Sequence, residues 1–219
     1  MSTEKPPSPS LSFIAAWVLA NLIGWASGLV LGQSLAPSLA SLPISWPFDR
    51  DLLSMYVTVA VLGLTVGAFQ SIAIRRSVAR PSSWLAATIM GFATCLGIFA
   101  VANSIPVSLA RTETLNNAIL LAIMGTAIGI CQFWVLRQRH GRSGIWVPVS
   151  AVAFLFFLWV IIDPSRSQGE FYVRATVAGT MAAVVTGTIL YVIMRPSLGG
   201  ISLGAPSQSN TSYDGSRTA

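Results

Sequence analysis

The sequence predicts an all-α membrane protein with six transmembrane helices, built as three helical hairpins with both termini in the cytoplasm. The first observation is composition: 53% of the residues are hydrophobic, only 9% are charged, and the mean hydropathy is +0.70. Soluble domains carry about 25% charged residues. The second observation is a series of long apolar runs, and the third is an internal repeat of the segments that join them.

Six apolar runs have the length that a helix needs to cross a bilayer, which is about 20 residues. They lie near 12–33, 52–74, 84–105, 115–136, 145–162 and 173–194, and the fifth is the shortest. None alternates polar and apolar residues as a barrel strand does, so each is predicted to be helical. Between the first two runs, Pro37, Pro43 and Pro47 predict that no helix continues.

The runs define one transmembrane domain over residues 12–195. Residues 1–11 are polar and rich in Pro and Ser, and residues 196–219 are rich in Gly, Ser and Pro. Such segments lack the apolar residues needed to build a core. We expect both to be disordered and cytoplasmic.

Basic residues set the orientation. The N-terminus, the second and fourth loops and the C-terminus hold nine Lys and Arg, against four in the other three loops. Five of the seven acidic residues lie in those three loops. Because short cytoplasmic loops are enriched in Lys and Arg, the basic side is predicted to be cytoplasmic.

Two segments, 67–84 and 129–146, are closely similar. Gly, Gln, Arg, Arg and Trp recur at Gly67/Gly129, Gln70/Gln132, Arg75/Arg137, Arg80/Arg142 and Trp84/Trp146. A weaker third copy has Gly187 and Arg195, with Leu190 in the place of the glutamine. The repeat predicts hairpins over about 12–75, 84–137 and 145–195, all entering from the same side, and makes a pseudo-threefold arrangement plausible.

Glycines spaced four residues apart mark one face of the even-numbered helices. Small residues let helix backbones approach closely in lipid, where no hydrophobic force drives helices together. The predicted packing positions are Gly63, Gly67, Gly125, Gly129 and Gly187. Their contacts could be within the chain, with a second copy or with a partner.

Gln70 and Gln132 follow the glycines on the same helical face. An amide in lipid needs a hydrogen-bonding partner. Either the two side chains fix the register of the hairpins, or they contact a bound head group, solute or pigment, for instance by ligating the magnesium of a chlorophyll. They are the candidate cofactor-binding residues, although the sequence identifies no particular cofactor.

Arginines cluster in the two repeated loops. They are Arg75, Arg76, Arg80, Arg137, Arg139 and Arg142. Cations beside the cytoplasmic leaflet attract anionic lipid. Besides setting orientation, these residues are therefore predicted to contact anionic lipids or an acidic partner.

The sequence lacks the marks of several function classes. No ionisable residue lies deep in a span, whereas proton relays and ion-coupled transporters place them there. We find no nucleophile with a base, no metal-spaced ligand set and no nucleotide fingerprint. We therefore expect no enzyme, no catalytic residues, no metal site and no nucleic-acid binding.

The repeated G-x-x-Q-aromatic-x-x-L-R pattern of 129–137, followed by a basic turn and Trp146, resembles a loose set of six-span bacterial membrane proteins without an established activity, many of them cyanobacterial. The first copy departs from it at Ser71 and Ile74. The resemblance implies a bacterial inner membrane or a thylakoid membrane, and an accessory role beside a large pigment–protein complex.

Three functions follow as expectations. The first is a non-catalytic accessory, assembly or stabilising subunit, whose partners are lipids and other membrane subunits or a second copy. The second is a passive transporter or channel, with a path lined by Gln70, Gln132, Asn21 and Asn103. The third is pigment or lipid binding.

Overall fold

The structure, a computed structural model, describes residues 11–42, 50–75, 80–104, 112–138, 140–161 and 167–195. This part of the chain is helical and contains no strand. The expected disorder of the two terminal segments concerns residues that lie outside these ranges, apart from Leu11.

The helices match the six predicted spans. They are α1 (Leu11–Ala40), α2 (Arg50–Ile74), α3 (Pro81–Ser104), α4 (Glu113–Leu136), a fifth span and α7 (Gln168–Met194). The fifth span consists of η1 (Ser143–Ile145), α5 (Trp146–Phe154), η2 (Leu155–Phe157) and α6 (Leu158–Ile161). Six helical segments are long and apolar enough to cross a membrane, and the fifth, with 18 residues, is the shortest. The chain is a multi-pass membrane protein.

One expectation at the end of α1 is wrong. Pro37 lies inside this helix, which continues to Ala40. A proline inside a helix removes one hydrogen bond of the ladder, and its ring crowds the carbonyl four residues earlier. The carbonyl of Pro37 still accepts from Ser41 N at 3.1 Å, so the helix survives for one more turn near its end. Pro43 and Pro47 lie outside the described residues.

Side chains cap two of the helices. Thr112 Oγ1 accepts from Leu115 N at 3.3 Å at the start of α4, and Ser167 Oγ accepts from Glu170 N at 3.4 Å at the start of α7. Such caps satisfy N–H groups that have no partner within the helix. They mark where these helices begin.

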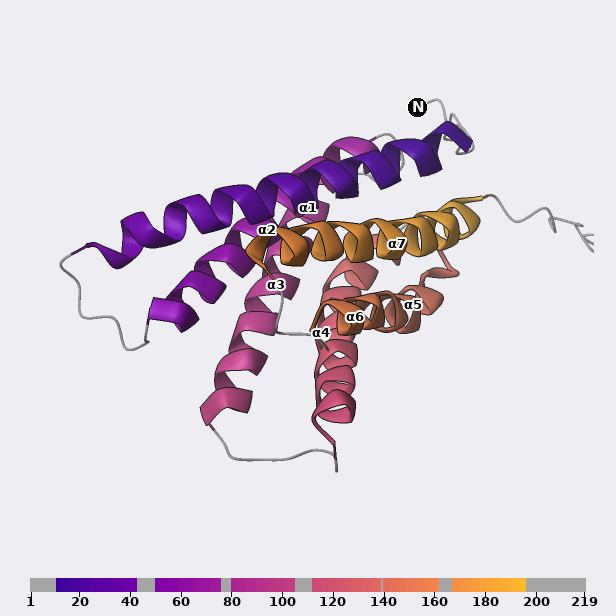
Figure 1. Cartoon of the computed structure of the whole chain (residues 1–219). Coiled ribbons are helices and arrows are strands. Elements are labelled where there is room, and N and C mark those ends of the chain that lie inside the picture. Colours follow the sequence, from indigo (N-terminus) through magenta and orange to yellow (C-terminus); the bar gives the residue numbers. More distant parts are fainter. Residues whose placement is uncertain are drawn as a thin grey trace, which may run out of the picture.

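The helices form a closed ring in chain order. Each spanning helix contacts the next one, and α7 returns to contact α1. In Figure 1, α1 and α2 point away from α3 and α4 at the ends that lead to the loops after Ala40 and Ser104. The helices thus come together at one end of the ring and separate towards the other.

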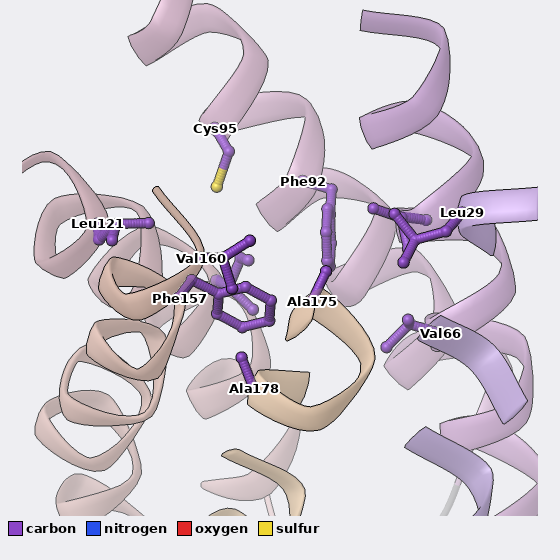
Figure 2. Packing of buried hydrophobic residues seen from close by; sticks show 11 residues of the cluster. Leu29, Val66, Phe92, Cys95, Leu121, Phe157, Val160, Ala175 and Ala178 are labelled. Carbon is purple, nitrogen blue, oxygen red and sulfur yellow. The ribbon is translucent and has the colours of Figure 1, made fainter. Parts of the chain in front are cut away.

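Two groups of buried residues lie inside the ring. The first, at the converging end, includes Trp17, Trp84 and Trp146 together with Ile74, Leu136 and Met194. The second lies farther along the helices and includes Leu29, Leu62, Phe92, Leu121 and Phe157. Figure 2 shows side chains of the second group converging from several helices.

Candidate functional site

Three tryptophans form a triangle at the converging end of the ring. Trp17, Trp84 and Trp146 lie near the starts of α1, α3 and α5, and each is at most 1% exposed. Their ring centroids are 5.8, 6.3 and 5.9 Å apart, with edge-to-face geometry for every pair. This is the arrangement that aromatic quadrupoles favour. We call these residues the tryptophan triangle.

Each indole N–H of the triangle donates to a polar side chain on the preceding helix of the ring. Trp84 Nε1 donates to Gln70 Oε1 at 3.0 Å, and Trp146 Nε1 donates to Gln132 Oε1 at 3.1 Å. In the third hairpin the glutamine is replaced by Leu190, and Trp17 Nε1 donates instead to Thr186 Oγ1 at 3.2 Å. All three buried indoles are therefore satisfied.

The amide nitrogens extend these bonds into one network. Gln132 Nε2 donates to Thr88 Oγ1 at 2.9 Å and to Gln70 Oε1 at 3.4 Å. Gln70 Nε2 donates to Asn21 Oδ1 at 2.8 Å, and Asn21 Nδ2 donates to Trp17 O at 2.9 Å. Together with the indole bonds, the network joins all six spans. Of the two readings that the sequence left open, these contacts within the chain are of the kind that a role in hairpin register requires. Asn103, whose side chain lies outside the described part, cannot be placed in it.

The two candidate cofactor-binding residues are thus occupied by protein contacts. Gln70 is 7% exposed and Gln132 is 3% exposed, and both carbonyl oxygens accept from an indole. Gln70 Oε1 already accepts two hydrogen bonds, from Trp84 Nε1 and Gln132 Nε2. Among the described residues, no three His, Cys, Asp or Glu side chains gather as metal ligands would.

The five predicted packing glycines lie at contacts within the chain. A Cβ on Gly63 would lie 2.7 Å from Phe92 Cβ, and one on Gly125 would lie 2.5 Å from Ser150 O. A Cβ on Gly187 would lie 2.6 Å from Trp17 Cδ1. A Cβ on Gly67 would lie 3.1 Å from Thr88 Cβ, and one on Gly129 would lie 2.9 Å from Ser150 Cβ. These faces hold neighbouring helices of the ring together.

The described basic residues of the loops lie on the surface. Arg75, Arg80, Arg137 and Arg142 are exposed, while Arg76 and Arg139 are outside the described residues. The guanidinium of Arg137 lies 4.3 Å from the ring centroid of the exposed Trp134. Arginine beside an aromatic ring is suited to the interface between lipid and water.

A cavity of about 440 Å³ lies between the helices, displaced from the tryptophan triangle towards the end of the ring where the helices separate. All six spans contribute to its lining. Trp25, Phe92 and Phe154 line it, each eight residues beyond a tryptophan of the triangle, or about 12 Å along a helix. Phe157 completes an aromatic group, with its ring centroid 4.5 Å from that of Trp25. Figure 2 shows Phe92, Phe157 and Val160 pointing into this region.

Polar groups gather at one end of the cavity. They are Gln33, Ser54, Thr58 and Asn117, all towards the helix ends that are farther from the triangle. Gln33 Nε2 donates to Thr58 Oγ1 at 3.4 Å, and Thr58 Oγ1 donates to Ser54 O at 2.8 Å. None of the described lining residues is charged. We call these four residues the polar mouth.

The cavity was not predicted from the sequence. A signal was present, because an aromatic residue follows each tryptophan of the triangle by eight residues: Trp25, Phe92 and Phe154. Eight residues correspond to about 2.2 helical turns, so these rings lie about 80° around the helix from the tryptophans, within one broad face. The pattern alone could not distinguish a lined cavity from a filled core.

No protein-family model, no curated protein and no solved structure matches the chain. The functional argument therefore rests on the residues themselves.

Proposed function

We propose that this protein binds an apolar small molecule within the membrane, in the cavity between its helices. The observation that carries the proposal is the cavity of about 440 Å³ whose described lining is uncharged and contributed by all six spans. Ligand sites are typically concave, mainly apolar and about 300–1,000 Å³ in volume. Of the functions that the sequence allows, lipid or pigment binding fits this site best.

The tryptophan triangle favours binding over passage. It lies at the end of the ring opposite the polar mouth, and its three rings pack against one another with at most 1% exposure. Gln70, Gln132 and Asn21, which would line a channel, are bonded to each other or to the triangle. A guest would thus enter and leave at the mouth, and the chain has no need of catalytic residues.

The proposed orientation places the triangle on the cytoplasmic side and the mouth on the other side. The nine-to-four distribution of Lys and Arg supports it. Equivalent bonds of Trp84 and Trp146, both to a glutamine 14 residues earlier, support an origin from repeated hairpins. The exposed arginines on the triangle side would contact anionic lipid of a bacterial inner or thylakoid membrane.

An accessory or assembly role remains a second proposal. The exposed apolar side chains that cover the outside of the ring, such as Trp134 and Trp159, could contact another membrane subunit as well as lipid. The predicted packing glycines do not support a partner, because they contact neighbouring helices of the same chain. Purification in mild detergent with a stoichiometric partner would support this role.

Filling the cavity tests the binding proposal. Ala175 lines the cavity and is 3% exposed, so Ala175→Phe places a ring where the guest would lie. We expect native mass spectrometry to detect one hexadecanol per wild-type chain and to lose that adduct in Ala175→Phe. Val177→Phe, two residues away on the outer surface and 40% exposed in the wild type, is the matched control and should keep the adduct. A wild-type chain without any adduct would contradict the proposal.

A further inference from the structure

We infer that the guest is an uncharged amphiphile, held with its hydrogen-bonding group at the polar mouth and its apolar body pointing towards the tryptophan triangle. The inference rests on the proposed function and names the class and direction of the ligand. It follows from three features of the cavity: the confinement of its polar lining residues to one end, the available depth, and the absence of charge in its described lining.

The polar lining residues are confined to one level of the cavity, whereas apolar residues such as Phe99 and Phe171 at that level and Phe92 deeper line it throughout. On α1 the order from the mouth inward is Gln33, Leu29 and Trp25, and on α2 it runs from Ser54 to Leu62. Asn117 on α4 lies at the mouth level, while Met124 lies deeper. Gln33 and Thr58 are bonded to each other, so the Asn117 amide is the group that a wholly apolar guest would leave facing hydrocarbon, which is unfavourable for a group that forms hydrogen bonds. A guest with one polar end satisfies both levels.

The depth fits an extended apolar body. Eight residues separate Gln33 from Trp25, and eight separate Ser54 from Leu62, which corresponds to about 12 Å at the helical rise of 1.5 Å per residue. Aromatic rings at the deep end, including Phe92 and Phe157, offer flat surfaces to a chain or ring. The cavity thus accommodates a good part of a long-chain alcohol.

Charge at the mouth selects against ionised head groups. The described lining holds no charged side chain, so neither sign of head group finds a counter-ion there. The described basic residues at this end, Arg50 and Arg174, do not line the cavity. Arg50 lines a separate space of about 290 Å³ that shares only Ser54 with the cavity, and Arg174 Nη1 donates to Trp159 O at 3.4 Å. An uncharged hydroxyl or carbonyl fits the mouth best.

A series of probes with one chain and different head groups tests the inference. The full-length protein in detergent is titrated with hexadecanol, hexadecane, hexadecyl sulfate and hexadecyltrimethylammonium, and bound probe is counted by native mass spectrometry. We expect hexadecanol to bind about tenfold more tightly than each of the other three, since about 1.4 kcal/mol of differential interaction gives that ratio. Comparable binding of hexadecane, or tighter binding of either ion, would overturn the inference while leaving apolar binding intact.

Substitution of the mouth supplies a second readout. Asn117→Leu should remove the preference for hexadecanol over hexadecane but keep the binding of both. Asn116→Leu is the matched control, because it removes the neighbouring amide, which is not part of the lining, and it should keep the preference. An unchanged preference in Asn117→Leu would count against the assigned orientation. Failure of every probe to bind would instead contradict the proposed function itself.

Discussion

Gln132 illustrates how a single side chain can connect several helices. Its amide nitrogen donates to Thr88 and Gln70, and its carbonyl oxygen accepts from Trp146. The third hairpin has Leu190 at the equivalent position, yet its tryptophan still finds an acceptor in Thr186, four residues earlier on α7. The requirement is therefore an acceptor for a buried indole N–H, not glutamine as such.

Gln132→Leu should destabilise the protein by about 1–3 kcal/mol, because it leaves the Trp146 N–H buried without its acceptor. The measurement is the free energy of unfolding in detergent or bicelles. Trp146→Phe removes the donor, so the double variant should cost less than the sum of the two single variants. Strict additivity would mean that the bond between Gln132 and Trp146 contributes nothing.

Helix contacts explain why small residues recur at particular levels. Along α1, a Cβ on Gly24, Gly28 or Gly32 would lie within 2.8 Å of α2 atoms, so the two backbones approach closely over two turns. Gly97 on α3 differs, because no atom lies within 4 Å of the position of its Cβ. Only the glycines at contacts are required by the packing.

A pair of glycine substitutions tests this distinction. Gly125→Ala should lower stability by about 1–3 kcal/mol, because the added methyl group meets the Ser150 carbonyl oxygen at 2.5 Å and forces α4 from α5. Gly97→Ala should be neutral or stabilising by up to about 1 kcal/mol, because alanine favours the helix. Thermal unfolding of both variants provides the comparison. Equal losses would show that helix contacts do not govern the effect.

At the scale of the whole molecule, ring closure creates the site. Trp17 and Thr186 are 169 residues apart, and their bond joins the first helix to the last. The six spans that close the ring also line the cavity, and they separate towards the ends farther from the triangle (Figure 1). One end of the ring therefore holds the aromatic and amide side chains of the triangle and its network, and the proposed binding cavity lies towards the other end.

The orientation of the ring is open to a direct measurement. With both termini in the cytoplasm, a green fluorescent protein fused after Ala219 should fluoresce, and alkaline phosphatase at the same site should be inactive. Phosphatase fused after Leu42, at the opposite end of α1, should be active. Phosphatase activity at the C-terminus would reverse the proposed sidedness of the mouth.

The sequence by itself determined the number and approximate bounds of the six helices, because a spanning helix satisfies its own backbone in lipid and needs only a local run of apolar residues. It also singled out Gln70 and Gln132 as unusual. Only the tertiary structure decided what they contact. Gln70 is hydrogen-bonded to Asn21, which is 49 residues away, and to Trp84, which is 14 residues away on the other side of the loop. It likewise decided that the rings eight residues beyond each tryptophan border a cavity. Such pairings depend on how distant helices meet in three dimensions, and a one-dimensional pattern does not contain that information.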